Sequence, residues 1–366
     1  MQELCPNGVE TKTIGDICEI CRGKVISKDF INENKGDYPV YSSQTENNGE
    51  LGKISTFAFD GEYLSWTTDG ANAGTVFYRN GKFNITNVCG LLKVRKMDLL
   101  IKYLYYVLNA EAPKYVNKGM GNPKLMSNVM AKITIPIPPL PVQEEIVRIL
   151  DNFTELTAEL TAELTARKAQ FIYYRRALIE NTTDMQALSL GELATIKTGS
   201  KPEIILETPT AYEYINAGTS NSGYVVSFNC EGDAVTTPSR GQGGIGFVGY
   251  QRNPFWLGPL CYRIQAKDGK KVLNRYLYYY LSCFNEKILA FKKEGGTPAV
   301  NVSDLVGITI DLPPIDEQKR IVAILDRFDA ICNDLSTGLP AEIEARQKQY
   351  EYYRDKLLTF KEVRQC

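Results

Sequence analysis

The chain contains Pro138-Pro-Leu-Pro-Val-Gln143-Glu-Glu-Ile-Val-Arg-Ile-Leu150-Asp-Asn-Phe153 and repeats it, with substitutions, as Pro313-Pro-Ile-Asp-Glu-Gln318-Lys-Arg-Ile-Val-Ala-Ile-Leu325-Asp-Arg-Phe328, at an offset of 175 residues. Downstream, Ala166-Arg-Lys-Ala-Gln170-Phe-Ile-Tyr173-Tyr174-Arg175 recurs as Ala345-Arg-Gln-Lys-Gln349-Tyr-Glu-Tyr352-Tyr353-Arg354, at an offset of 179. Fainter matches upstream extend the similarity toward the N-terminus. Self-similarity over nearly the whole length predicts a duplication of one structural plan.

Two segments, 142–180 and 315–366, have the apolar pattern of long helices. Their apolar residues recur at spacings of three and four, with Glu, Thr and Arg between them, which is typical of amphipathic helices of coiled-coil type. Neither helix can bury its apolar stripe alone, so we expect the two to pack against each other. Gly338 and Pro340 predict a fresh helix start inside the second segment. The residues expected to pack are Ile146, Leu150, Phe153, Leu156, Leu160, Leu164, Ile321, Leu325, Phe328 and Leu335.

The remaining segments, 1–141 and 181–314, have a mixed pattern. Short alternating apolar runs between Gly, Asn and Pro turns predict strands, and each segment also contains one helical period with an aromatic stripe. The predicted fold class is therefore α+β. It consists of two homologous mixed α/β domains separated by two long helices, with an internal pseudo-two-fold repeat.

The composition excludes several kinds of site. The 366 residues include no histidine, which excludes Ser-His-Asp and Cys-His catalysis and every His-ligated metal site. Nine cysteines, an odd number, are typical of reduced thiols. The N-terminus lacks the basic and apolar segments of a secretory signal, and the apolar runs are too short to span a bilayer. We therefore expect a cytoplasmic protein without membrane contact.

Three short motifs are weak indicators of chemistry. Gly241-Gln-Gly-Gly-Ile-Gly246 satisfies G-x-G-x-x-G, but no buried strand is predicted before it. Asn253-Pro-Phe-Trp256 resembles an amino-methyltransferase motif only in part, and no Gly-rich cofactor motif accompanies it. Cys18 and Cys21 have no second pair at a spacing suitable for zinc. We expect no catalytic residue and no metal site in this chain.

The repeated organisation resembles that of a known family. Two mixed domains, each followed by a Gln-x-x-Ile-Val-x-Ile-Leu-Asp-x-Phe helix and an Arg-x-x-Gln-x-x-Tyr-Tyr-Arg end, are similar over the whole chain to a specificity subunit of a type I restriction–modification system (HsdS). The resemblance implies that 1–141 and 181–314 are target recognition domains, each recognising one half of a bipartite DNA sequence. It implies that the helices of 142–180 and 315–366 form an antiparallel spacer, which sets the gap between the half-sites.

The same resemblance implies the partners. These would be double-stranded DNA, methyltransferase subunits, expected to be two, which dock on the helices, and restriction subunits. S-adenosylmethionine, ATP and Mg²⁺ would be bound by the partner subunits, and no cofactor would be bound by this chain.

The first long helix contains Thr157-Ala-Glu-Leu160 followed directly by Thr161-Ala-Glu-Leu164. Because four residues slightly exceed one helical turn, adding or removing one unit changes the helix length by ~6 Å and leaves the apolar stripe nearly aligned. Low-complexity drift explains the pattern equally well. In the family that the chain resembles, the number of such units tunes the gap, and two units imply a short non-specific spacer.

The charge balance is unusual for a protein that binds DNA. The net charge is −1, with 16 Lys and Arg against 14 Asp and Glu in 1–141 and 12 against 12 in 181–314. Neutralisation of phosphates supplies most non-specific affinity for DNA. We therefore expect this chain alone to bind DNA poorly and the partner subunits to supply much of the phosphate contact.

Two loops in each mixed domain are candidate DNA contacts. The loops 67–74 and 236–244 both begin with Thr-Thr and then differ, as two different half-sites would require. Gly-containing turns at 118–124 and 292–298 carry lysines that suit phosphates. Solvated turns without DNA contact remain an alternative for each single residue. The residues expected near bases are Asp69, Asn72, Ser239, Arg240 and Gln242, and those expected at phosphates are Lys118, Lys124, Lys292 and Lys293.

The preferred hypothesis is a non-catalytic DNA specificity subunit. Two other classes of function stay open. The first is a coiled-coil scaffold whose mixed domains bind protein partners. The second is an enzyme in its own right, such as a methyltransferase or a nuclease.

Overall fold

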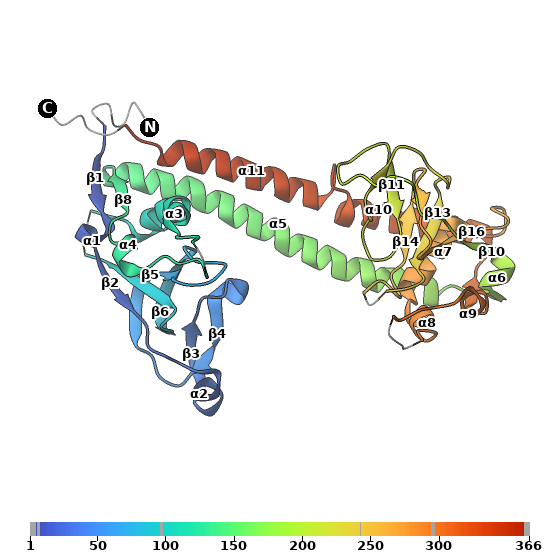
Figure 1. Cartoon of the computed structure of the whole chain (residues 1–366), viewed down its shortest axis with the longest axis horizontal. Helices are drawn as coiled ribbons and strands as arrows, with labels where there is room; N and C mark the ends of the chain where they lie inside the picture. The colour runs from blue at the N-terminus through green and yellow to red at the C-terminus, as the bar shows by residue number, and fades with distance from the viewer. Residues whose placement is uncertain are drawn as a thin grey trace. The chain divides into compact units, whose positions relative to one another are not determined.

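The computed structural model contains two compact units. The first unit comprises Met1–Glu159 and Ile343–Cys366, and the second comprises Leu160–Glu342. The boundary cuts the 41-residue helix α5 (Leu140–Glu180), so each unit contains about half of that helix (Figure 1). The structure describes residues 5, 8–95, 98–119, 121–241, 243–293 and 297–361.

A six-stranded sheet forms the base of the first unit. Its strand order is β2-β7-β5-β6-β3-β4, and every neighbouring pair is antiparallel except β3 and β6. A separate antiparallel pair, β1 and β8, leads into α5. The strands are β1 (Glu10–Thr13), β2 (Cys18–Arg22), β3 (Lys35–Tyr41), β4 (Glu50–Ile54), β5 (Phe59–Thr67), β6 (Val76–Ile85), β7 (Cys89–Val94) and β8 (Thr134–Ile137). The helices and 3-10 turns are α1 (Ile14–Ile17), α2 (Lys28–Glu33), η1 (Glu46–Gly49), α3 (Ile101–Glu111), η2 (Ala112–Tyr115) and α4 (Ser127–Met130).

The second unit repeats this plan with shorter strands. Its main sheet has the order β10-β16-β13-β14, a smaller sheet has the order β12-β11-β15, and β17 pairs with β9. The strands are β9 (Gln186–Ser189), β10 (Ala194–Thr198), β11 (Tyr212–Ile215), β12 (Tyr224–Val225), β13 (Ala234–Pro238), β14 (Gly249–Gln251), β15 (Trp256–Leu257), β16 (Cys261–Ala266) and β17 (Thr309–Leu312). The helices are α6 (Leu190–Leu193), α7 (Asn274–Cys283), α8 (Glu286–Leu289), α9 (Val302–Val306) and α10 (Ile315–Asn333).

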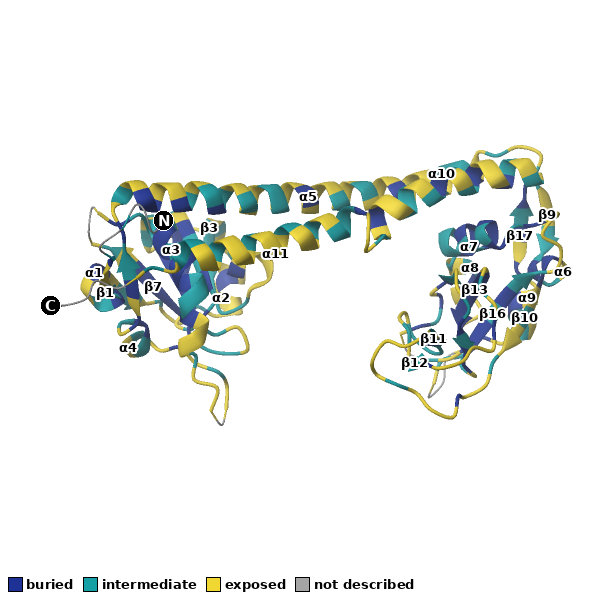
Figure 2. Ribbon diagram, turned by 90° about the horizontal axis from the view of Figure 1, so that it is seen from above, coloured by how far each residue is buried: buried dark blue, intermediate teal, exposed yellow. Residues whose placement is uncertain are grey.

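The aromatic stripes of α3 and α7 lie in the cores. Tyr103 and Tyr106 pack in one cluster with residues of β5 and of the first half of α5. Tyr276 and Tyr279 pack equivalently in the second unit with residues of α10. Each buried phenol still forms a hydrogen bond, as a buried polar group requires. Figure 2 shows the buried strands and helix faces of both units.

A buried glutamine shows how closely the two units correspond. Gln143 has no exposed surface, and its Nε2 donates to the carbonyl oxygens of Asp98 (2.9 Å) and Pro138 (2.8 Å), while its Oε1 accepts from the N–H of Leu100 at 2.8 Å. Gln318 forms the same three bonds, at 2.9–3.0 Å, with the equivalent residues of the second unit. Both glutamines therefore fasten a long helix to the domain that precedes it, and the predicted duplication is confirmed.

The long helices pack by means of aromatic pairs at equivalent positions. In the first unit, Phe153 of α5 stacks on Tyr353 of α11 (Leu339–Leu358) with ring centroids 5.5 Å apart. In the second unit, Tyr174 of α5 stacks on Phe328 of α10 at 5.6 Å. The earlier helix α10 thus contacts the later half of α5, and the later helix α11 contacts the earlier half. The predicted antiparallel pairing is confirmed. Two successive helices, α10 and α11, together pair with the single helix α5.

One predicted packing residue is wrong. Leu335 is 79% exposed because it lies beyond the end of α10, in the turn that leads to α11. Asp334 ends the helix: its carboxylate accepts hydrogen bonds from the N–H and hydroxyl groups of Ser336 and Thr337. Cys332, the second-last residue of α10, is buried. The predicted fresh helix start near Pro340 is confirmed, since α11 begins at Leu339.

The other predicted packing residues are buried to different degrees. Among the described residues, Ile146, Leu150, Ile321 and Leu325 have no exposed surface, Leu160 is 9% exposed, and Phe153, Leu156, Leu164 and Phe328 are half-buried. Within the described part of the chain, no helix combines the length and apolar character needed to cross a membrane.

Candidate nucleic-acid interface

The two predicted contact loops of the first unit lie against each other. Thr68 accepts the N–H of Leu125 at 2.9 Å, and Gly70 donates to the carbonyl oxygen of Pro123 at 3.0 Å. These bonds join the loop 67–74, between β5 and β6, to the Gly turn that carries Lys118 and Lys124. Both lysines are exposed. Residues predicted from separate motifs therefore form one continuous surface.

Asp69 is the electrostatic centre of that surface. Its carboxylate lies 3.7 Å from Lys124 Nζ and 3.6 Å from a guanidinium nitrogen of Arg22, and it accepts the hydroxyl of Thr68 at 2.6 Å. Arg22 also donates to the carbonyl oxygen of Asn87 at 2.7 Å. Two cations are thus held at one half-buried carboxylate, which fixes the loop and leaves local positive charge.

The second unit joins its loop and turn in the same manner. Gly241 donates to the carbonyl oxygen of Pro298 at 3.1 Å, and Val300 donates to that of Ser239 at 3.0 Å. Arg240 forms an isolated bridge with Ala299 and has an exposed side chain. Lys293 Nζ lies 3.3 Å from Asp304. The backbone bonds between loop and turn are those of the first unit, and Arg240 occupies the position of Asp69.

This correspondence corrects the sequence alignment of the two loops. The strand registers pair Thr67 with Cys89 and Pro238 with Cys261. Thr67 therefore corresponds to Pro238 and not to Thr236. The two Thr-Thr pairs lie two residues apart in the structural alignment, so their similarity in sequence is a coincidence. The structurally equivalent loops are 67–74 and 238–244.

The predicted base-contacting residues differ in their positions. Asn72 is exposed, and its amide donates to Thr45 Oγ1 at 3.3 Å. Arg240 is exposed, whereas Asp69 is half-buried. Ser239 is 5% exposed and its backbone holds the loop, so its position does not support the predicted base contact. Gln242 lies outside the described residues. The predicted phosphate residue Lys292 is exposed.

Arg22 was missed by the sequence analysis. It is the last residue of β2, far from either loop in sequence, and approaches Thr68 and Asp69 only because β2 and β5 both pair with β7. Only the sheet order, which no local motif contains, could have revealed it.

The recurring cysteines have structural roles. Burial raises the pKa of Cys89 to about 11 and that of Cys261 to about 12, so both thiols stay protonated at neutral pH. Burial also raises the pKa of Cys18 to about 12, which disfavours the thiolate that a zinc ligand needs. Among the described residues, no group of three or more Cys, Asp or Glu side chains is arranged to hold a metal.

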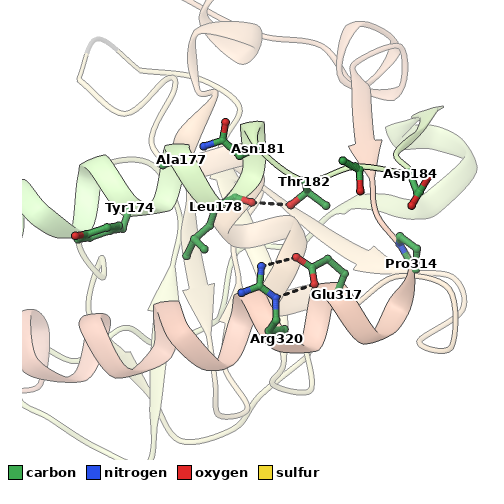
Figure 3. Close-up of a pocket in the computed structure, with 10 residues that line it drawn as sticks. Tyr174, Ala177, Leu178, Asn181, Thr182, Asp184, Pro314, Glu317 and Arg320 are labelled. Atoms are coloured by element: carbon green, nitrogen blue, oxygen red, sulfur yellow. Dashed lines mark hydrogen bonds and ion pairs between the residues drawn. The ribbon is translucent and has the colours of Figure 1, made fainter.

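A pocket in the second unit lies between the end of α5 and the start of α10 (Figure 3). The Arg320 guanidinium pairs with Glu317 at 2.6 Å, and the Thr182 hydroxyl donates to the carbonyl oxygen of Leu178 at 2.7 Å. Tyr174 borders the same hollow. Figure 3 marks interactions for Arg320, Glu317 and Thr182, and it places Asn181 and Asp184 at the border of the same hollow.

Comparisons with known proteins agree on one family. The model of the type I restriction modification DNA specificity domain matches residues 6–167 and 182–345. The putative type I specificity subunit S.MpnORF507P of Mycoplasma pneumoniae is 35% identical over 95% of this chain and 97% of its own length. The type I restriction enzyme MpnII specificity subunit of the same organism is 46% identical over 50% of this chain and 56% of its own length.

Solved structures show the same fold. The type I restriction–modification S subunit from M. genitalium matches with a TM-score of 0.69 and 18% identity, covering 96% of both chains. A chain from a structural study of complex assembly and conformational transition of the type I R-M system matches with a TM-score of 0.58 and 16% identity, covering 96% of this chain and 98% of that one.

Proposed function

Because this chain belongs to the type I restriction–modification DNA specificity family, we propose that it is the subunit that selects the DNA sequence for a type I complex. Each unit contacts one half of a bipartite target. The observation that carries this proposal is the pair of equivalent loops, 67–74 and 238–244, fastened by the same backbone bonds and carrying different side chains. One scaffold with two different contact surfaces is what two different half-sites require.

The exposed side chains of these surfaces suit the chemistry of DNA. Asn72 and Arg240 are the proposed base contacts, because amide and guanidinium groups match the edges of adenine and guanine in the major groove. Lys118, Lys124, Lys292 and Lys293 are the proposed phosphate contacts. Asp69 keeps Lys124 and Arg22 in place and is proposed to accept a hydrogen bond from a base amino group.

The chain is proposed to act without catalysis of its own. It contains no histidine, and burial raises the pKa of several of its thiols. S-adenosylmethionine, ATP and Mg²⁺ are proposed to bind to the methyltransferase and restriction subunits. Purified chain is expected to give no heat of binding with S-adenosylmethionine in calorimetry, and a measurable heat would contradict this division of roles.

The long helices are proposed to dock the methyltransferase subunits. On α5, Ile172 is 60% and Tyr173 68% exposed, and on α11 the equivalent tyrosine, Tyr352, is 60% exposed. Large exposed apolar side chains on a helix are typical of a surface that a partner covers. The equivalence of Tyr173 and Tyr352 supports two docking sites, one for each unit.

The proposal is tested by mapping methylated adenines in a host that expresses the methyltransferase subunit with and without this chain. A bipartite methylated motif that appears only with the chain is expected. Methylation that is identical in both strains would contradict a specificity role and favour a scaffold whose mixed domains bind proteins.

A further inference from the structure

Each unit contains a second loop that the sequence motifs did not reveal. Residues 42–49 join β3 to β4, and residues 216–223 join β11 to β12. The preceding strands pair in parallel with equivalent partners, Tyr41 with Ile85 and Ile215 with Leu257. The two loops therefore occupy the same place in the fold and have the same length.

The sequences of these loops also correspond. Thr45-Glu-Asn-Asn-Gly49 aligns with Thr219-Ser-Asn-Ser-Gly223, so the threonine, the central asparagine and the glycine are shared. Gly49 and Gly223 have φ angles of 78° and 129°, a region that favours glycine. Both loops thus end in a glycine of positive φ, but their turns differ before it: Asn47 and Asn48 also have positive φ in the first loop, and Gly218 does in the second.

Both loops border the contact loops described above. In the first unit the amide of Asn72 donates to Thr45 Oγ1 at 3.3 Å. In the second unit a Cβ placed on Gly244 would lie 2.8 Å from the backbone nitrogen of Gly218, so the two backbones touch. Loop 42–49 therefore extends the surface of loop 67–74, and loop 216–223 extends that of loop 238–244.

The residue beneath the second loop differs between the units. The strand registers make Arg79 equivalent to Gln251. Arg79 Nε donates to Ser65 Oγ at 2.9 Å, and Gln251 Nε2 donates to the equivalent hydroxyl, Thr236 Oγ1, at 3.2 Å. Arg79 additionally donates to the carbonyl oxygen of Asn48 at 2.8 Å, which holds loop 42–49 from below.

Arg79 places a buried positive charge under the first unit's loop. It is 2% exposed, and its guanidinium lies 3.5 Å from the ring centroid of Tyr41 and 4.5 Å from that of Phe77. In the part of the chain that the structure describes, the Arg79 guanidinium donates to a hydroxyl and to a carbonyl oxygen, and not to a carboxylate. Burial lowers its pKa to about 10, which still leaves it charged at neutral pH. In the second unit, Gln251 instead borders a pocket whose lining includes Asn216, Asn221 and Thr236.

We propose that loops 42–49 and 216–223 are a second base-contacting element of each recognition domain. Asn47 and Asn48 act in the first domain, and Ser220 and Asn221 act in the second. Asn47, Asn48 and Ser220 are exposed, and Asn221 is half-buried with its amide donating to Glu213 Oε1 at 3.3 Å. Amides and hydroxyls beside a proposed contact loop suit hydrogen bonding to base edges. Arg79 is the positioning residue of the first loop. This inference rests on the proposed function and names further residues that determine its specificity.

The backbone permits a clean test in the first domain. Asn47 and Asn48 have φ angles of 48° and 53°, so the double variant Asn47→Gly/Asn48→Gly removes both amides and keeps the turn. The variant is expressed with its methyltransferase subunits and its methylated adenines are mapped. One half-site is expected to lose discrimination at one or more positions, by about 5- to 150-fold for each contact, while the other half-site stays unchanged.

The second domain supplies the reciprocal experiment. Ser220→Ala/Asn221→Ala is expected to relax the other half-site only. Asn128→Ala, which removes an exposed amide from α4, outside both loops, is the matched control and is expected to preserve both half-sites. Arg79→Gln introduces the residue of the second unit and is expected to reduce base discrimination at the same positions as the glycine variant. Arg79→Lys is expected to retain part of that discrimination.

The outcomes separate this inference from the function on which it rests. If wild-type chain produces no chain-dependent motif, the proposed function fails. If wild type produces a bipartite motif and both loop variants produce the same motif with the same occupancy, this inference is overturned. If methylation is lost altogether, binding of the assembled complex to duplexes with single base changes decides. A smaller penalty for a wrong base, or loss of cognate binding with non-specific binding retained, supports the inference, and unchanged penalties overturn it.

Discussion

Gln318 and Gln143 show how much a single buried polar side chain contributes in this fold. Each forms three hydrogen bonds to backbone groups. Gln318→Ala is expected to lower the free energy of unfolding of the second unit by ~2–4 kcal/mol, because each lost bond contributes ~1 kcal/mol and buried groups are left unsatisfied. The urea midpoint measures this. Gln347→Ala, at an exposed site on α11, is the control and is expected to change stability by less than ~0.5 kcal/mol. Equal effects of the two variants would contradict the account.

The buried thiols lead to a prediction about reactivity. Burial raises the pKa of Cys18, Cys89 and Cys261 to between about 11 and about 12, so the reactive thiolate is scarce at pH 7. Peptide mapping after brief maleimide treatment at pH 7 is expected to find these three unmodified, and to find all three modified in urea. Modification of Cys89 or Cys261 in the native chain, at a rate near that of a free thiol, would show that these cysteines of β7 and β16 are not buried as described.

At the scale of elements, the long helices were predictable and the contact surface was predictable only in part. The helices follow from a local apolar period that a single stretch of sequence contains, and only the final apolar residue, Leu335, was misplaced, because Asp334 ends the helix first. The contact surface depends on sheet order. Arg22 reaches Asp69 through strand pairing, and loop 42–49 retains only three residues in common with its equivalent.

The four-residue units of α5 predict the effect of an insertion. One further Thr-Ala-Glu-Leu unit after Leu164 adds ~6 Å of helix and rotates the chain by only ~40° beyond a full turn. Since DNA rises ~3.4 Å per base pair, the gap between the methylated half-sites is expected to grow by about one or two base pairs with both half-sites unchanged. Adenine mapping measures the gap.

A matched control tests whether the apolar stripe matters. Insertion of a single alanine at the same place rotates the stripe by ~100° and separates the packed pairs of α5. This variant is expected to lose methylation or to melt at lower temperature. If the four-residue insertion instead changed a half-site and left the gap constant, the helices would not set the spacing.

At the scale of the whole molecule, the net charge of −1 predicts weak binding of DNA by the isolated chain. Few phosphates can be neutralised by two nearly neutral recognition domains, so the affinity is expected to approach the non-specific range, with a Kd of ~10⁻⁴–10⁻⁶ M at physiological salt. Fluorescence anisotropy with a cognate duplex, with and without methyltransferase subunits, checks this. Tight and strongly salt-dependent binding by the chain alone would contradict the expected contribution of the partners.

The central claim is that two equivalent recognition domains act independently on two half-sites. It is tested most directly by replacing residues 181–314 with the corresponding domain of a relative and mapping the methylated adenines of a host that expresses the chimera with its methyltransferase subunits. The account predicts a motif in which one half-site is new while the other half-site and the gap are retained. A motif that stays unchanged, or one in which both half-sites change together, would contradict it.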